Sequence, residues 1–524
     1  MSTPADDATP EATPVSDVPW ERLDARIVLA AFLSGLVRLA PAAIAWWLFD
    51  QDDVAARVTV AALAAVALVH PANEALKFLK IRYRITPSEL QVRKGLLVRS
   101  AHTVPLHRIR TVDITAPLLH RLLGLAVLTV GTGSNRMTDT STGVSLGGLR
   151  EPVAASLRSR LLRETRVPTD DPEPSAADDT APADDTVAGL RWGWIVYAMS
   201  GLWLVLGSVS VGGTLFGMAS LVGRADWLTG GVAAAWVALG TFAAAVALVV
   251  FLLVGALAGA VTFVTGWWGY RLVREPGGTF VATRGLLTTR SFTADPARMR
   301  GVTLTSSPIV RLLGGALARP VMTGVSLSQE MREAAALLPT TTREEAVRLA
   351  DTLLGAPVLQ PLEDGAVRLV THPPAARRRA VARWLIADAV VAGLLALGVT
   401  LGGWSGWLLA VPVALLPLCV LAGRAAYRAL GHALVDDRLY LQRGVVLRRT
   451  DALEVRGISG ATVTQSPVQR WLGLAHLVAT TAAGEQAYRA VDVAVGDATA
   501  LAAALTAEPG IASPAPADAR ALGV

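Results

Sequence analysis

The chain has 524 residues, of which 52% are hydrophobic and only 17% are charged, and its mean hydropathy is +0.46. This composition is too apolar for an ordinary soluble protein and indicates a membrane-embedded chain. The formal net charge of +6 comes from arginines beside apolar runs, which favours anionic lipid headgroups over nucleic acid as partners. The single cysteine, Cys419, excludes a disulfide framework or a cysteine-rich metal site within one chain.

Apolar runs long enough to cross a bilayer, which takes about 20 residues, occur in three pairs. The six predicted spans are 27–49, 54–76, 194–221, 232–267, 384–404 and 407–430. Lys and Arg are scarce in the short turn inside each pair and frequent at the other ends. This asymmetry places the long segments and both termini in the cytoplasm.

The chain divides into hairpins, globular modules and polar connections. In order, we predict a disordered N-terminal tail (1–25), a first transmembrane hairpin (26–80), a first module (81–165), an acidic disordered linker (166–188), a second hairpin (189–268), a second module (269–357), a basic linker (358–382), a third hairpin (383–430), a third module (431–508) and a C-terminal tail (509–524). Each module contains short Val, Leu, Ile and Thr runs broken by turn residues, which is typical of strands.

A repeated pattern of glycines marks the three modules. Gly95, Gly285 and Gly444 each follow an expected strand, and Gly124, Gly314 and Gly473, which close the phrases RLLG, RLLG and RWLG, each stand 29 residues later. The closing phrase suits one helical turn stopped by glycine, and each module ends in a helix-forming run. The sequence therefore predicts an α+β membrane protein with six transmembrane helices as three hairpins, each followed by a cytoplasmic β-sandwich or barrel capped by a C-terminal helix.

Strand, glycine, VPLHRIRTVDI, RLLG and closing helix after a membrane hairpin resemble the bacterial pleckstrin-homology-like (bPH) multi-pass membrane protein family. The resemblance implies a two-sheet sandwich capped by a helix, no known catalysis, and a smaller companion protein with one module. It does not imply phosphoinositide binding. The third module departs from the pattern, since Gly457 and Ser459 stand where Arg108 and Arg110 stand in the first.

Repeated arginines are the candidate interaction residues. Three residues before each closing glycine stand Arg121, Arg311 and Arg470, which either hold an anionic headgroup or satisfy carbonyl groups at the end of the helical turn. On expected strands, Arg108, Arg110, Arg298 and Arg300 alternate and form either a basic stripe for lipid or a partner, or a solvated face.

Two charged residues lie inside predicted spans. Arg38 is in the middle of the first, and Asp388 is one turn into the fifth. Because an unpaired charge is costly in a bilayer, we expect both to face the bundle interior, either paired or lining a cavity.

No complete catalytic, cofactor or metal motif is found. GVSLG at 143–147 has the letters of a hydrolase elbow, but the other modules have no nucleophile there, so Ser145 is interpreted as part of a strand. His102 and His107 lack partner ligands at suitable spacing. We therefore expect no catalysis, no cofactor and no bound metal.

The favoured interpretation is a non-enzymatic scaffold or binding protein of the bacterial cytoplasmic membrane, with a role in envelope maintenance or stress tolerance. It would contact anionic lipid headgroups and assemble with itself or with a smaller single-module relative, because three weak contacts on one chain give avidity. The alternative is a lipid or small-molecule transporter, or an export component, regulated by the modules. A hydrophobic cavity containing Arg38 would favour that alternative.

Overall fold

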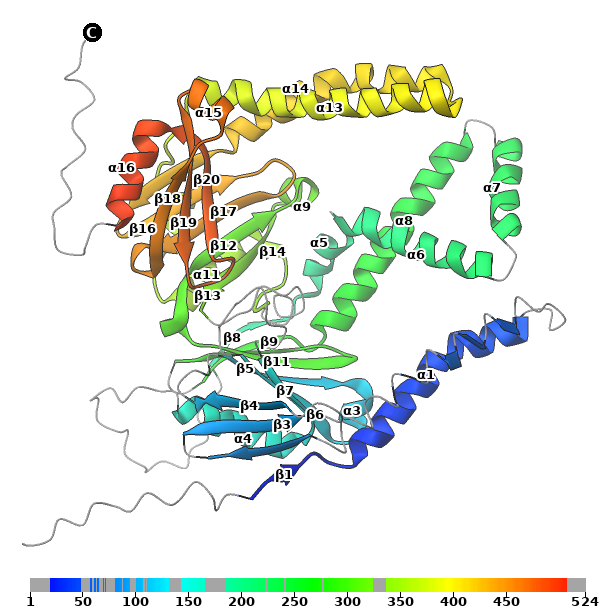
Figure 1. Cartoon of the computed structure of the whole chain (residues 1–524), viewed down its shortest axis with the longest axis vertical. Helices are drawn as coiled ribbons and strands as arrows, with labels where there is room; N and C mark the ends of the chain where they lie inside the picture. The colour runs from blue at the N-terminus through cyan, green and yellow to red at the C-terminus, as the bar shows by residue number, and fades with distance from the viewer. Residues whose placement is uncertain are drawn as a thin grey trace, which may run out of the picture. The chain divides into compact units, whose positions relative to one another are not determined.

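The computed structural model describes residues 19–48, 81–131, 143–164, 185–323 and 336–506, with short gaps inside 81–131 and 185–323, and isolated residues between 57 and 71 (Figure 1). It confirms a mixed α+β architecture of sheets and long apolar helices. The chain forms two compact units, one built on residues up to 181 with 214–237 and 284–293, the other on the remainder.

The first globular segment consists of two small sheets and a closing helix. Its elements are β1 (Glu21–Arg22), α1 (Arg26–Leu48), β2 (Arg82–Ile85), β3 (Glu89–Lys94), β4 (Ser100–Pro105), β5 (Thr111–Pro117), α3 (Leu118–Leu122), β6 (Leu125–Gly131), β7 (Gly143–Arg150) and α4 (Glu151–Glu164). Leu90, Val92, Leu128 and Leu146 point inward from the strands, and α4 closes the core with Leu161. Alternate strand residues face opposite sides of a sheet, which explains why a period of two appears in the sequence.

The second segment follows the same order of elements. They are β8 (Asp185–Gly189), η2 (Trp192–Trp194), α5 (Ile195–Met199), α6 (Leu202–Leu221), α7 (Ala225–Leu239), α8 (Phe242–Trp267), β9 (Arg271–Arg274), β10 (Phe280–Arg284), β11 (Thr288–Ala294), η3 (Pro296–Arg298), β12 (Met299–Ser306), α9 (Pro308–Leu312), β13 (Gly315–Met322), β14 (Thr341–Thr342), α11 (Arg343–Leu354) and α12 (Gln360–Glu363).

The third segment repeats the order again. Its elements are α13 (Pro374–Gly402), η4 (Gly406–Leu409), α14 (Ala410–Arg428), β15 (Gly431–Val435), β16 (Arg438–Arg443), β17 (Arg448–Glu454), η5 (Val455–Gly457), β18 (Ile458–Thr464), α15 (Pro467–Trp471), β19 (Leu474–Thr481), β20 (Ala487–Ala494) and α16 (Val495–Thr506). Leu477, Tyr488, Val493 and Leu501 belong to its buried core, which α16 closes.

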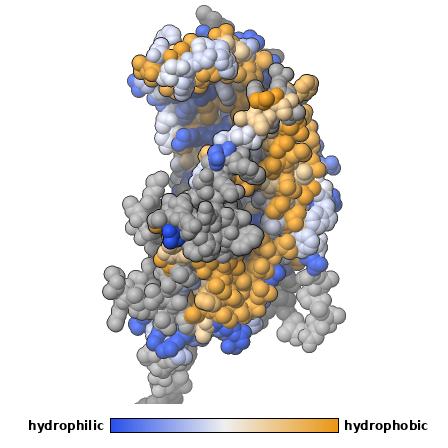
Figure 2. All heavy atoms as spheres, turned by 90° about the vertical axis from the view of Figure 1, so that its right-hand side faces the viewer, coloured by the Kyte–Doolittle hydropathy of each residue, from blue (hydrophilic) through white to orange (hydrophobic). Residues whose placement is uncertain are grey.

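Three of the described helical stretches are long and apolar enough to cross a membrane: α8, α13 and Gly406–Arg428. A fourth is possible if Trp192–Met199 and Leu204–Gly217, which meet at 71°, form one broken span. Exposed large hydrophobic side chains are concentrated on such helices, and apolar residues cover much of the face in Figure 2. The predicted span 54–76 lies largely outside the described residues.

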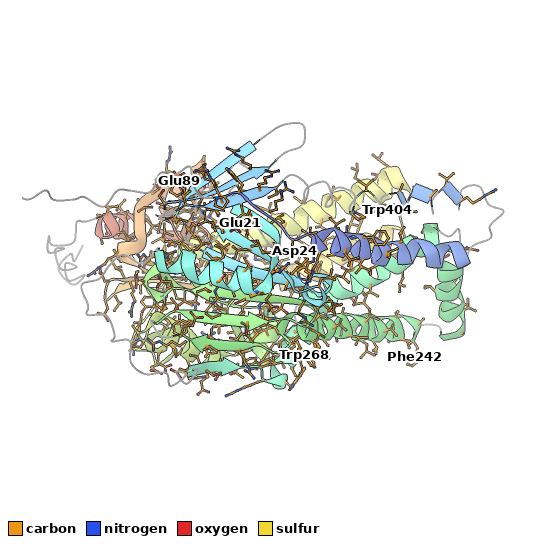
Figure 3. The ribbon with its side chains drawn as sticks, turned by 90° about the horizontal axis from the view of Figure 1, so that it is seen from below. Glu21, Asp24, Glu89, Phe242, Trp268 and Trp404 are labelled. Atoms are coloured by element: carbon orange, nitrogen blue, oxygen red, sulfur yellow. The ribbon has the colours of Figure 1, made fainter. Side chains whose placement is uncertain are left out.

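The predicted fourth span, 232–267, contains residues of two described helices. The helix α7 ends at Leu239 and α8 begins at Phe242. Phe242 and Trp268 mark the two ends of α8 in Figure 3. At its C-terminal end Trp268 makes an edge-to-face contact with Trp192 at 5.6 Å between ring centroids, a geometry that aromatic pairs favour.

Residues before each predicted hairpin pair with the first strand after it, and the sequence analysis missed this. β1 pairs with β2, β8 pairs with β9, and Val370 forms a single bridge with His432 of β15. Residues 21–22 and part of 185–189 had been assigned to the tail and the acidic linker. Figure 3 shows Glu21 and Asp24 at the base of α1. The residues at both ends of each predicted hairpin are therefore attached to the same sheet.

Strands also pair across segments. Within the smaller unit, β11 of the second segment extends the β7-β6-β5 sheet of the first by pairing with β5. Within the larger unit, β12 pairs with β17 in a six-stranded sheet of order β14-β13-β12-β17-β16-β15. We call these the first and second junctions.

Two glycines of α8 allow a close helix contact. An added Cβ at Gly255 would lie 2.1 Å from the Leu204 carbonyl oxygen, and one at Gly259 would lie 2.4 Å from the Ala198 carbonyl oxygen. The spacing of four residues puts both on one face of α8, the small-residue pattern that lets membrane helices approach closely.

Replacing Gly255 with alanine should force these helices apart and destabilise the protein by about 1–3 kcal/mol, the usual cost of overpacking. Thermal unfolding of the purified protein in detergent measures this. Gly266→Ala on the same helix is the matched control, because an added Cβ there meets nothing within 4 Å. Equal unfolding temperatures for the two variants would contradict the packing account.

Candidate anion-binding pocket at the base of the last hairpin

A cavity of about 440 Å³ lies in the larger unit where the sheet of the second junction meets Arg383 of α13 and the C-terminal end of α14. Four guanidinium groups line it, from Arg319, Arg383, Arg443 and Arg449, together with one carboxylate, Glu485. The helix side is completed by Ala426 and Leu430, at the end of α14. We call this cavity the arginine pocket.

Strand pairing brings the arginines together from different segments. Arg319 on β13 is opposite Thr303 of β12, and Arg449 on β17 is opposite Thr305 of β12. Arg443 ends β16, and its register partner is again Arg449. Residues more than 120 positions apart in the sequence thus share one wall.

Arg449 is held in place by three acceptors. Its Nε donates to Asp451 Oδ1 at 2.7 Å, its Nη1 to Glu485 Oε2 at 2.5 Å, and its Nη2 to Thr303 Oγ1 at 3.4 Å. The guanidinium also lies over the Tyr488 ring, 5.4 Å from its centroid. Arg449 is therefore a fixed cation in the pocket wall.

Asp451 links the two segments across the second junction. Thr303 Oγ1 of β12 donates to Asp451 Oδ1 at 2.7 Å, and the carboxylate is fully buried. Burial raises the pKa of Asp451, while the Arg449 charge and hydrogen bonds oppose that rise. The Asp451 carboxylate thus forms its ion pair with Arg449, beneath the pocket.

Arg443 is the pocket arginine whose surroundings disfavour its positive charge. Burial lowers the pKa of its guanidinium, the charges of Arg449 and Arg489 lower it further, and Asp451 and Glu485 oppose the fall. A cation that is partly desolvated beside other cations gains free energy when an anion binds next to it. The arginine pocket therefore has the electrostatic requirement of a phosphate or carboxylate site.

The first turns of α13 are fastened to the third segment by a buried carboxylate. Asp492 accepts a hydrogen bond from Arg379 Nη1 and another from Gln469 Nε2 at 2.9 Å, and Arg383 Nη2 lies 3.6 Å from its second oxygen. Asp492 is fully buried and has a φ of 59°, a strained backbone conformation for aspartate. Such a conformation persists only where surrounding contacts hold the residue in place. Arg383 therefore joins this ion pair to the arginine pocket.

Two buried histidines lie next to that attachment. His372 Nδ1 contacts the Asp492 carbonyl at 3.1 Å, and His372 Nε2 contacts His432 Nδ1 at 3.2 Å. Since a carbonyl can only accept, His372 Nδ1 carries its proton, its Nε2 accepts, and His432 Nδ1 donates. Burial, and next the neighbouring His432, lowers the pKa of His372 to about 4.

The contribution of His372 to stability should fall when the pH drops from about 6.5 towards 4, because the folded protein keeps His372 neutral while the unfolded chain takes up a proton. Asp113, whose pKa burial raises to about 7, acts in the opposite direction in this window, so the His372 contribution is measured against a His372→Gln variant. The slope from this one group approaches about 1.4 kcal/mol per pH unit in that window. Chemical unfolding of both proteins across the window measures it, and the free energy of unfolding of wild type should fall relative to that of His372→Gln as the pH drops. If the free energy of unfolding depended on pH in the same way in wild type and variant, His372 would not be the cause of the pH dependence.

The repeated arginines of the RLLG phrases lie beside the strand junctions. Arg121 Nη1 donates to Thr289 Oγ1 of β11 at 3.0 Å, which crosses the first junction. The charge of Arg311 contributes to a lowered pKa of Arg448 on β17, after burial and Arg343, so Arg311 is near the second junction. Arg470 is exposed on α15.

The other predicted arginines do not line the pocket. Arg298 pairs with Asp295 at 3.5 Å, and Arg300 lies 3.8 Å from Glu454 and donates to the carbonyls of Ala297 and Met299. Arg108 and Arg110 lie outside the described residues. Whether a basic stripe acts in binding stays a prediction.

The two intramembrane charges have different surroundings. Arg38 is exposed on α1 and lines a cavity of about 440 Å³ with Ile27, Val37 and Leu118, among others. Asp388 is buried on α13, the helix that packs along α14. They belong to different compact units, so their pairing stays a prediction.

Sequence reasoning missed all four pocket arginines. One signal was present, because a basic residue precedes the turn glycine in every copy, in VRKG, ATRG and LQRG. The last of these is Arg443. No comparable pattern marks Arg319 or Arg383, whose places in the pocket depend on strand and helix packing.

The model of the bacterial PH domain family matches residues 25–165 and 383–508, which together exceed half of the chain. The chain therefore belongs to the bacterial PH domain family. The match covers the first and third segments with their preceding hairpin regions. Comparisons with curated proteins and with solved structures give no match.

Proposed function

We propose that the chain is a non-enzymatic membrane scaffold of bacteria whose PH-like modules bind anionic lipid headgroups and join the chain to further copies or to a smaller relative. The observation that carries the proposal is the arginine pocket, where four guanidinium groups meet the ends of two apolar helices. A membrane-binding domain needs such a juxtaposition, because the headgroup phosphates lie where the apolar part of a spanning helix ends.

The proposal includes a third PH-like module at 269–357, between the two matched regions. Support comes from the shared order of elements and from a bulge in the same place: the register shifts between Met299 and Gly301 in β12 and between Ile458 and Gly460 in β18. Gly301 and Gly460 both stand 13 residues before their closing glycines, Gly314 and Gly473.

The position of the pocket along α13 supports the headgroup as the ligand. Arg377, Arg378, Arg379 and Arg383 precede the long apolar part of the helix, and Trp384 follows directly. Arginines at the end of a span favour the cytoplasmic side, and a tryptophan favours the interface. We infer that the pocket opens at the cytoplasmic headgroup layer and that the modules are cytoplasmic.

Short-chain phosphatidylglycerol should raise the thermal stability of the purified protein more than short-chain phosphatidylcholine does, because only the former places net negative charge in the pocket. Arg443→Gln and Arg319→Gln together should weaken this effect by about tenfold or more in lipid concentration, as expected when charge-assisted hydrogen bonds are lost. Titration followed by thermal unfolding measures it.

Arg456→Gln is the matched control for that experiment. Arg456 belongs to the same segment, and its side chain is 84% exposed and does not line the pocket. It should leave the lipid response unchanged. A response that is equal in the double variant and in the control would contradict headgroup binding in the pocket.

One observation favours the transporter as a second candidate. The cavity beside α1 contains Arg38 among mainly apolar residues, as a lipid path would require. Within the smaller unit this cavity lies against α3, where Leu118, Leu119 and His120 contribute to its wall. If Arg38→Leu abolished movement of a fluorescent lipid between vesicle leaflets while wild type supported it, transport would replace scaffolding as the main function.

A further inference from the structure

The two strand junctions have one and the same register. In the first, Thr289 of β11 pairs with Ala116 of β5; in the second, Arg448 of β17 pairs with Ser306 of β12. Thr289 and Arg448 each stand four residues after their turn glycines, and Ala116 and Ser306 each stand eight before their closing glycines. The junction is therefore a repeated interface and not a chance contact.

Each copy of the module has two strands suited to this interface. The strand after the turn glycine, which we call the leading strand, is β4, β11 or β17, and the strand before the RLLG phrase, the trailing strand, is β5, β12 or β18. The first junction uses β5 with β11, and the second uses β12 with β17. Among the described strands, β4 and β18 remain at the edges of their sheets.

The two free strands expose positions that the junctions bury. Thr462 of β18 is exposed, whereas the residues at the same position, Asp113 and Thr303, are only 4% and 6% exposed. On the leading side, Thr103 of β4 is exposed, whereas its counterpart Ala452 is fully buried. Each free strand thus exposes the residues that would be buried if it formed a junction with a partner strand.

The free trailing strand also lacks the features that prevent strand addition. Proteins protect sheet edges with Pro, Lys, inward-pointing charges or β-bulges. The bulge of β18, between Ile458 and Gly460, is also present in β12, which pairs with β17 nonetheless, so it does not prevent strand addition. β18, with the sequence ISGATVT, contains none of the other three features over Ile458–Thr464. Its outer backbone groups are consequently open to pairing with another strand.

We propose that β18 of one copy of this chain pairs antiparallel with β4 of a second copy, with Thr462 opposite His102. The proposal rests on the third module assigned in the proposed function. The register follows from the second junction, because Thr303 and Thr462 both stand 11 residues before their closing glycines, and Asp451 and His102 both stand seven after their turn glycines. A second copy is the occupant because this chain itself contains the complementary strand.

The repeated arginine of the RLLG phrase receives a role in this assembly. Arg121 donates across the first junction, and Arg311 is near Arg448 at the second. Arg470 would be the corresponding residue at the junction between copies. This interface is heterologous, so copies join head to tail and form either a closed ring or an open row.

Disulfide trapping between two differently tagged populations tests the register. One population carries Thr462→Cys and the other His102→Cys, both with Cys419→Ser, so that any disulfide between the tags joins separate copies. Directly opposed residues of antiparallel strands have Cα atoms about 4.5–5.5 Å apart, within disulfide range. We expect a mixed-tag dimer after mild oxidation in membranes.

The control pairs Thr462→Cys with Ala101→Cys, because adjacent strand residues point to opposite faces. Equal trapping in the two combinations, or none in either, would overturn the proposed pairing. So would capture of Thr462→Cys by a smaller membrane protein in place of the second copy.

Thr462→Lys supplies an independent readout that leaves the sheet intact, because Thr462 is exposed. An edge lysine should shift the assembly in mild detergent to the monomer, measured by native mass spectrometry. The response to phosphatidylglycerol should remain that of wild type. If the assembly persists in Thr462→Lys, strand addition is wrong even where headgroup binding holds; if only the lipid response fails in wild type, the proposed headgroup site is wrong.

Discussion

The return of the chain to its own sheet after each predicted hairpin is the constraint on which the rest depends. β1 with β2, β8 with β9, and Val370 with His432 join the residues before a hairpin to those after it. These pairings hold the residues that flank each predicted hairpin next to one another. In the last hairpin the same arrangement brings Arg383 and Leu430 to one side of the sheet, where the arginine pocket forms.

The glycine pattern predicted the local structure well. Gly124, Gly314 and Gly473 all have left-handed φ values, 68°, 72° and 64°, at the end of the short helices α3, α9 and α15. Gly285 and Gly444 also have positive φ, at 114° and 95°, and a Cβ there would meet the carbonyl of Thr288 or Leu447 within about 2 Å. Such conformations select glycine by sterics alone, so they can be read from the sequence.

The neighbours of each strand could not be read in that way. A period of two tells which face of a strand is buried, but it does not tell which strand lies alongside. The pairing of β12 with β17 therefore had no signal, and neither did Arg319 in the arginine pocket. The attachment of α13 was missed for a related reason, because Asp492 lies in a strand-forming run, and only its burial beside Arg379 distinguishes it.

One departure of the third module from the repeat has a physical reason at the second junction. Gly457 stands where the first two modules have arginine, and an added Cβ there would lie 2.8 Å from Cδ of Arg300. The aliphatic part of Arg300 occupies that space while its guanidinium lies 3.8 Å from Glu454. The absence of a side chain at Gly457 therefore leaves room for Arg300 of the second segment to pack against the third.

The helix α13 runs without a break from Pro374 to Gly402, across 29 residues, and its first turns lie among polar groups of the third segment. A span longer than the hydrocarbon layer tilts to fit it, and the tilt depends on bilayer thickness. Arg379 is fixed to the third segment by Asp492, whereas Arg383, one turn further along the helix, borders the pocket. If α13 tilted in this way, one wall of the pocket would move relative to the sheet, and the width of the pocket would then depend on the thickness of the surrounding membrane.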